Sequence, residues 1–146
     1  MYKRQHIYVA GGCDGETLVN QIEMYDPAKD EWSLLTSLST PRYNFGIAFA
    51  DAKIFIVGGT ADFHLTPLND VEVYDVKNND IEPEDSLNAA RFSLSAAAVG
   101  KVVYAIGGIA TVASSSTVVR SSYPMLQTLC QYTVEEYVIS SKNTRA

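Results

Sequence analysis

The chain repeats itself, and this repetition constrains its fold more than any other feature of the sequence. Residues 22–26, Ile-Glu-Met-Tyr-Asp, return 49 positions later as Val-Glu-Val-Tyr-Asp at 71–75. The Gly-Gly pair at 58–59 returns at the same offset at 107–108, and an earlier pair stands at 11–12. A fixed period of about 20 to 50 residues is the signature of a repeat architecture, in which each unit buries its apolar face against its neighbours.

Each unit reads as a set of short strands. Residues 7–10, 54–57 and 102–106 are apolar and rich in β-branched and aromatic side chains, and each run ends at a Gly pair. Residues 71–74 alternate between two kinds of side chain, as a strand with two different faces does. With a strand of small apolar residues at 44–50, each unit has four strands. The predicted fold class is therefore all-β, with the units as blades of a β-propeller.

These features resemble the kelch repeat family over about residues 7–108. The ordered set is an apolar strand ending in Gly-Gly, then Val/Ile-Glu-x-Tyr-Asp, then Trp32, then Pro41-Arg42. The resemblance implies an incomplete kelch-type β-propeller of about two and a half four-stranded antiparallel blades. The predicted blades are 7–40 (strands b to d), 41–88 and 89–146. Trp32 is expected to be wedged between blades, because its large ring suits that packing.

The third unit departs from the pattern after its Gly pair. The Val/Ile-Glu-x-Tyr motif follows the Gly pair by 10 and 12 residues in the first two units, but by 26 residues in the third, at 134–137. We expect an insertion at about 109–131, which makes blade 3 run to the C-terminus. The alternative is that the repeat ends near Gly108 and that the later motif is accidental.

Two and a half blades do not close a propeller, which has about four to eight. Three interpretations follow. The chain is a fragment or short isoform of a longer kelch protein, or two copies pair to approximate one ring, or the chain is an open, capped array. Because the end blades would expose apolar faces, we expect self-association through those faces.

Composition narrows the range of partners and locations. The chain has 11 Lys+Arg against 17 Asp+Glu, a net charge of −6. This balance argues against a nucleic-acid-binding surface and against a polybasic membrane patch. Two cysteines are too few for a disulfide scaffold, so a reduced, cytoplasmic location is expected. No apolar run approaches the roughly 20 residues of a transmembrane helix.

No catalytic or metal-binding constellation is predicted. The chain has two histidines, His6 and His64, and it lacks the Gly-x-Gly-x-x-Gly, Walker and Gly-x-Ser-x-Gly motifs. Some kelch-type propellers are enzymes, such as copper radical oxidases, but those need a set of Tyr and His ligands that this sequence does not supply. We expect no enzyme activity and no cofactor.

What remains is a binding surface made of loops. In an antiparallel blade the loops between strands b and c emerge on the same rim as the crossings from one blade to the next, and variable loops on a rigid scaffold often carry function. The resemblance implies that this rim holds a partner protein or peptide. Phe63 and Tyr43 would be aromatic anchors, and His64 or an arginine would face an acidic partner. The predicted partner-binding residues are Cys13, Asp14, Arg42, Tyr43, Asn44, Phe45, Asp62, Phe63, His64, Arg91, Phe92 and Ser93.

The resemblance implies a non-catalytic protein-interaction module. The first hypothesis is the substrate-recognition part of a kelch-like adaptor of a cullin-based ubiquitin ligase. Such adaptors carry a BTB and a BACK domain before the propeller, and neither is present in this sequence, so that role would belong to a longer parent chain. The second hypothesis is a cytoskeletal kelch protein that binds actin. The third is a kelch-type enzyme fragment.

Overall fold

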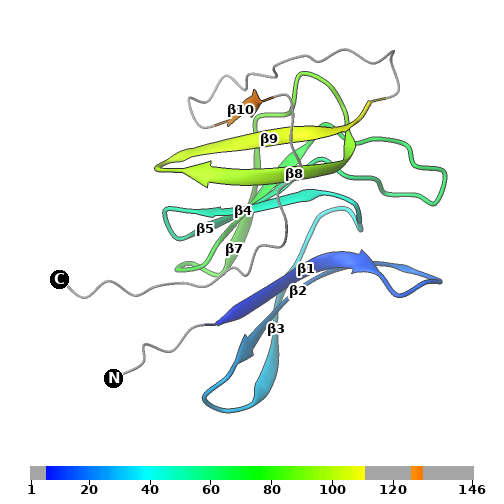
Figure 1. Ribbon diagram of the computed structural model, residues 1–146. Helices are drawn as coiled ribbons and strands as arrows, with labels where there is room; N and C mark the ends of the chain where they lie inside the picture. Colours follow the sequence, from blue (N-terminus) through cyan, green and yellow to red (C-terminus); the bar gives the residue numbers. More distant parts are fainter. Residues whose placement is uncertain (1–5, 111–125, 130–146) are drawn as a thin grey trace.

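The computed structural model describes residues 6–110 and a strand at 126–129. The described part is all-β, which confirms the predicted fold class, and it forms three small sheets stacked one on the next (Figure 1). The first sheet has the order β1-β2-β3, the second β4-β5-β6-β7 and the third β10-β9-β8. The strands are β1 (Ile7–Cys13), β2 (Leu18–Asp26), β3 (Glu31–Ser37), β4 (Gly46–Ala50), β5 (Lys53–Val57), β6 (Val71–Asp75), β7 (Asp80–Glu84), β8 (Phe92–Val99), β9 (Val102–Ile109) and β10 (Leu126–Leu129).

The second sheet is a complete four-stranded antiparallel meander, and its middle strands are buried on both faces. Along β5, Ile54 and Ile56 enter the apolar cluster shared with the first sheet, whereas Phe55 and Val57 enter the cluster shared with the third. All four side chains are at most 3% exposed. Burying a side chain of this size stabilises the fold by about 1.5–3 kcal/mol. A strand that is buried on both faces is rich in apolar side chains at successive positions, as residues 54–57 are.

The Gly pairs lie within or just after β1, β5 and β9, and in each pair at least one glycine comes too close to a neighbouring carbonyl for a side chain. Gly58 has a φ of +61°, in the left-handed region that favours glycine. A Cβ at this position would lie 2.6 Å from the carbonyl oxygen of Arg91. The pair thus lets the loop after β5 run against the crossing that leads into the third sheet.

The third sheet differs from the predicted blade. β10 pairs with β9 in parallel, with Leu126 opposite Val103, whereas the third strand of a kelch blade runs antiparallel to the second. A parallel pair needs a connection of a dozen or more residues, and residues 110–125 supply one of that length. Most of the predicted insertion at 109–131 and the motif at 134–137 lie outside the described residues, so the extent of the third blade stays a prediction.

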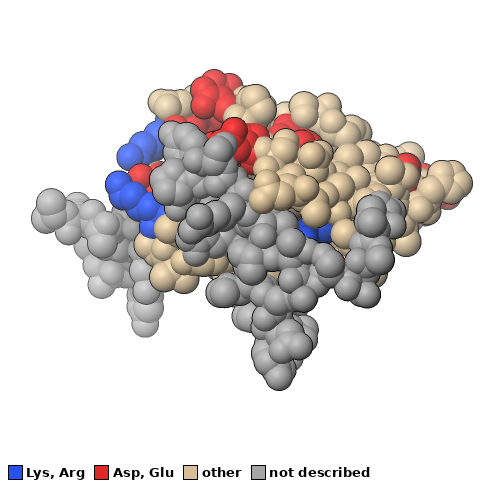
Figure 2. Space-filling view, turned by 90° about the horizontal axis from the view of Figure 1, so that it is seen from above, with Lys and Arg blue, Asp and Glu red and all other residues tan. Residues whose placement is uncertain are grey.

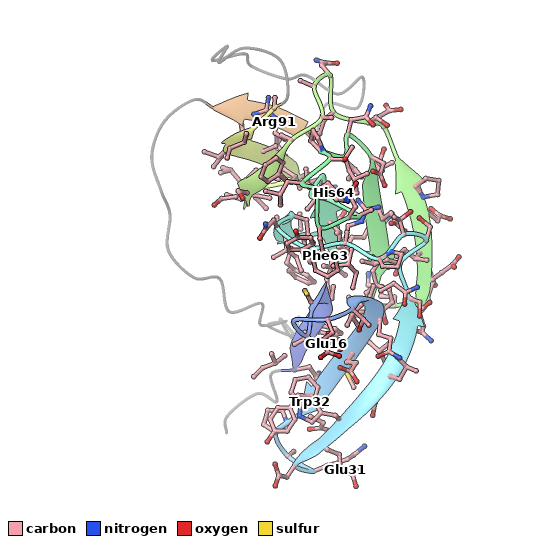
Figure 3. All side chains as sticks on the ribbon, turned by 90° about the vertical axis from the view of Figure 1, so that its right-hand side faces the viewer. Glu16, Glu31, Trp32, Phe63, His64 and Arg91 are labelled. Atoms are coloured by element: carbon pink, nitrogen blue, oxygen red, sulfur yellow. The ribbon has the colours of Figure 1, made fainter. Side chains whose placement is uncertain are left out.

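The prediction that Trp32 is wedged between blades is wrong for this chain. Its side chain is 54% exposed and contacts Tyr25, with the ring centroids 5.1 Å apart. Tyr74, at the repeat position of Tyr25, is only 2% exposed because it packs against Tyr8 of the first sheet. Trp32 lies on the first sheet at the end of the stack opposite Arg91, where it is left facing outward (Figure 3).

Candidate functional site

The loops that follow β1 and β5 meet the crossings between sheets on one rim of the stack. The Gly12 amide donates to the Arg42 carbonyl at 2.8 Å, and the Gly59 amide donates to the Arg91 carbonyl at 2.9 Å. Each contact joins the start of a loop to a crossing, as the predicted strand directions require. We call this edge the loop rim; both loops project from the right-hand side of Figure 1.

An aromatic pair forms the centre of the loop rim. Tyr43 and Thr60 exchange two backbone hydrogen bonds, of 3.1 and 3.0 Å, and the Tyr43 hydroxyl donates to the Asp62 carbonyl at 3.3 Å. Phe63 lies beside Tyr43, with ring centroids 6.1 Å apart and planes tilted by 43°. Phe63 is 55% exposed, so a fixed tyrosine supports an aromatic ring that remains open to a partner. The structure thus brings together the two residues predicted as anchors.

Asp62 and His64 flank Phe63 on the same loop. The Asp62 carboxylate accepts a hydrogen bond from the Thr66 amide at 3.0 Å. This backbone hydrogen bond lowers the pKa of Asp62, because it favours the charged form. His64 is exposed and stands next to Phe63 (Figure 3). The loop therefore presents an anion, an aromatic ring and an imidazole in succession.

The two crossings are joined at the loop rim by their backbones. The Ser93 amide donates to the Asn44 carbonyl at 2.7 Å, and both residues have a φ of 53°. Both are exposed, and they occupy the same position in successive repeats. Phe45, by contrast, is half-buried against the cluster between the first and second sheets. Asn44 and Ser93 therefore belong to the surface, whereas Phe45 mainly supports it.

Arg42 is buried and cannot contact a partner, which corrects its prediction as a binding residue. Its side chain is fully buried, and its Nη1 donates to the Gly58 carbonyl at 3.1 Å. Its Nη2 donates to Glu72 Oε1 at 2.6 Å and also to the Asp70 carboxylate. Glu72 accepts a further hydrogen bond from the Ser39 amide at 2.8 Å. Arg42 thus ties the crossing between the first two sheets to β5 and β6.

Arg91 and Phe92 are corrected in the same way. Arg91 is 6% exposed and donates to the carbonyl of Gly107, at the repeat position of Gly58, at 2.5 Å. Phe92 is 7% exposed. Neither side chain is open to a partner, because each fills the space where a crossing enters the third sheet.

The first loop, with Cys13 and Asp14, is shaped by its own turn. Asp14 accepts hydrogen bonds from the amides of Glu16, at 2.9 Å, and Thr17, at 2.6 Å. The Thr17 amide contributes most to lowering the pKa of Asp14 to about 2. Cys13 is exposed, with a free thiol whose Sγ accepts the Gly15 amide at 3.2 Å. Asp14 therefore shapes the loop while adding negative charge to it.

Sequence reasoning missed Asp70, Glu72 and Thr60, which hold the loop rim together. Thr60 is fully buried, and its hydroxyl donates to the Asp62 carbonyl at 3.1 Å. A signal for Glu72 was present: a glutamate recurs between two apolar residues at positions 23 and 72. A charged residue kept at one repeat position within a strand can indicate a buried partner, here Arg42.

Within residues 6–110 and 126–129, no group of three or more His, Cys, Asp or Glu side chains is placed to hold a metal ion. The same described residues contain no helix that is long and apolar enough to cross a membrane. On the face seen in Figure 2, acidic side chains are most prominent at the upper edge, and most of the visible basic side chains lie at the left.

Comparison with known proteins agrees with this architecture. Residues 4–39 and 41–80 match the Kelch motif. The chain is 46% identical over 41 residues to Kelch-like protein 28 of Mus musculus, which covers 28% of this chain and 7% of that protein. It is 38% identical over 60 residues to Kelch repeat and BTB domain-containing protein 1 of Vaccinia virus, over 38% of this chain and 11% of that protein.

A third relative is an F-box/kelch-repeat protein of Arabidopsis thaliana, 37% identical over 60 residues, which covers 40% of this chain and 16% of that protein. The chain therefore spans only a small part of the length of the curated relatives it matches. The two motif matches follow one another along the chain and fall on successive sheets of the stack. This chain therefore belongs to the kelch repeat family.

Proposed function

We propose that this chain is a protein-interaction module that binds a peptide segment of its partner across the loop rim. The observation that supports the proposal is the Phe63 ring, more than half exposed yet held against Tyr43 on a rigid base. Rigid aromatic side chains of this kind dominate the energy of protein interfaces. The exposed backbone turns at Asn44 and Ser93 offer polar contacts beside them.

The charge of the loop rim favours a basic or neutral segment over an acidic one. With Arg42 and Arg91 buried and Asp70 paired with Arg42, the other charged side chains of its two loops are the acidic Asp14, Glu16 and Asp62. This replaces the expectation of an acidic partner, because the arginines on which it relied are buried and like charges brought together at an interface are unfavourable. The segment that fits has an apolar side chain for Phe63 and hydrogen-bond donors or a basic side chain nearby.

We further propose that the chain serves as the substrate-recognition part of a kelch-like adaptor of a cullin-based ubiquitin ligase, in the cytoplasm. Similarity to Kelch-like protein 28 and to proteins that combine kelch repeats with a BTB or an F-box domain supports this proposal. The second candidate function is actin binding, which rests on the family resemblance alone. Under either function, the chain acts by binding and carries out no catalysis.

A capture experiment tests the binding surface. Immobilised chain is exposed to cell extract, and the proteins retained by the wild type are compared with those retained by the double variant Tyr43→Ala, Phe63→Ala. A true partner should bind the double variant about 30-fold more weakly, as expected for the loss of two anchors. Retention that is equal for both forms would contradict the proposed site.

The matched control lies on the opposite rim, in the turns after β2 and β6. The double variant Lys29→Ala, Asn78→Ala changes two exposed side chains whose partners, Asp26 and Asp75, belong to the same turns. It should retain the same proteins as the wild type.

Cosedimentation of the chain with filamentous actin tests the second candidate function. If the double variant Tyr43→Ala, Phe63→Ala still cosediments with actin, then actin binds elsewhere on the surface and not at the loop rim.

A further inference from the structure

One face of the first sheet is open and largely apolar, with Glu23 between Val9 and Leu34 as its one charged side chain. Its exposed large apolar side chains are Ile7 (39%), Val9 (43%), Trp32 (54%) and Leu34 (60%), and the Tyr25 ring contacts Trp32 at a tilt of 37°. They share one face because Tyr25 pairs across the sheet with both Ile7 and Trp32. Exposed apolar groups that are contiguous in this way mark an interaction surface. We call this surface the leading face.

The repeat shows what covers a leading face. On the second sheet, Trp32 and Leu34 match Ile81, which is half-buried, and Pro83, which is exposed. The positions of Ile7, Val9 and Tyr25 are taken by Ile54, Ile56 and Tyr74, which are 1%, 0% and 2% exposed. They are covered by the first sheet, where Tyr8 lies against Tyr74 with ring centroids 6.4 Å apart. We call the side of a sheet that covers the next one, such as the side of the first sheet that carries Tyr8, its trailing face. The leading face of one sheet therefore fits the trailing face of another sheet of the repeat.

The third sheet carries a trailing face with no fourth sheet among the described residues to cover it. Tyr104 stands at the repeat position of Tyr8, and it is paired with Ala97 on β8 as Phe55 is paired with Ala48 on β4. Tyr104 is half-buried, and Val99 on the same side of β8 is 67% exposed. The described chain thus carries both halves of the contact, at opposite ends of its stack (Figure 1).

We propose that two copies of this chain associate head to tail, the trailing face of the third sheet of one copy against the leading face of the first sheet of the other. Tyr104 of one copy lies against Tyr25 of the other, as Tyr8 lies against Tyr74 within the chain. Two copies bring six sheets, within the range of about four to eight blades in closed propellers, so a second contact of the same kind can complete a ring. This surface is separate from the loop rim and does not depend on the proposed function.

Trp32 reports on this contact without any substitution, because it is the one tryptophan of the chain. As protein concentration rises, the mass measured by light scattering should increase to that of two copies. The tryptophan emission should move to shorter wavelength over the same concentrations, as the ring leaves water. A mass that stays monomeric would overturn the proposal, and so would association that leaves the emission unchanged.

Complementary variants distinguish head-to-tail contact from other pairings. Leu34→Lys damages only the leading face, where it adds a cation opposite Glu23, and Tyr104→Lys damages only the trailing face. Each variant alone should self-associate about 30-fold more weakly than the wild type. A mixture of the two should associate, because each variant retains the face that the other has lost.

The control is Leu65→Lys, which alters an exposed apolar side chain on the loop after β5 and should associate like the wild type. Circular dichroism establishes that each variant is folded, and Val99→Lys replaces Tyr104→Lys if the latter is not. If the trailing-face variant associates normally on its own, the leading faces pair with each other and the proposal is wrong. A mixture that stays monomeric refutes it as well.

Discussion

Removing Arg42 should destabilise the fold more than its position in a surface crossing suggests. The substitution Arg42→Met keeps a long apolar stem and deletes the guanidinium group. That group bonds the Gly58 carbonyl and the Glu72 carboxylate, and the side chains of Arg42 and Glu72 are 0% and 6% exposed. Without the guanidinium, Glu72 would be an unpaired buried charge.

Breaking a buried ion pair by removing one partner costs about 3–5 kcal/mol. Typical domains are stable by about 5–15 kcal/mol, so this single substitution should remove a large part of the free energy of unfolding. Asp70 is 41% exposed and can be solvated when its partner is lost, so most of the cost comes from Glu72. The cost should be insensitive to salt, because a buried pair is poorly screened.

Urea denaturation followed by circular dichroism measures the effect, in protein dilute enough to be monomeric. The double variant Arg42→Met, Glu72→Gln should be more stable than the sum of the two single variants implies, since it leaves no buried charge unpaired. As a control, Lys101→Met breaks an ion pair with Asp51 in which both side chains are more than 60% exposed, and it should leave stability unchanged. A loss below about 1 kcal/mol for Arg42→Met would refute this account of the crossing.

Three further predictions concern the sheets and loops, each measured on dilute, monomeric protein. Trp32→Ala should lower the free energy of unfolding by about 1 kcal/mol, the value of one exposed aromatic pair, whereas Tyr74→Ala should lower it by about 3–5 kcal/mol; equal losses would mean that the two faces are equally buried. Gly58→Ala should cost clearly more than Gly100→Ala, because both have a φ near +60° but only Gly58 has a carbonyl within 3 Å of the added Cβ; equal melting temperatures would contradict this. The lowered pKa of Asp14 means that its charged form stabilises the first loop at pH values above about 4, and that this contribution is lost as the pH falls through about 2; an NMR titration of Asp14 with a midpoint near 4 would disprove it.

The sequence alone determined the strands, the repeat and the positions of the Gly pairs, because each of these depends on nearby residues. The apolar, β-branched runs at 7–10, 54–57 and 102–106 predicted strands, and they lie in β1, β5 and β9. The Gly-Gly pairs were predicted to follow these apolar runs, and all six of these glycines have positive φ. Strand direction predicted which loops share a rim.

The tertiary structure alone decided which residues of the predicted site are exposed. Arg42 was included among the predicted partner-binding residues, but its partner Glu72 lies 30 residues away in the sequence, and only the packing of β6 beside the crossing brings the two together. Trp32 has the residue type of a buried ring, yet its exposure depends on whether another sheet covers the leading face. Burial is a property of what lies across an interface, and a local pattern cannot specify a neighbour that comes from a distant part of the chain or from a second molecule.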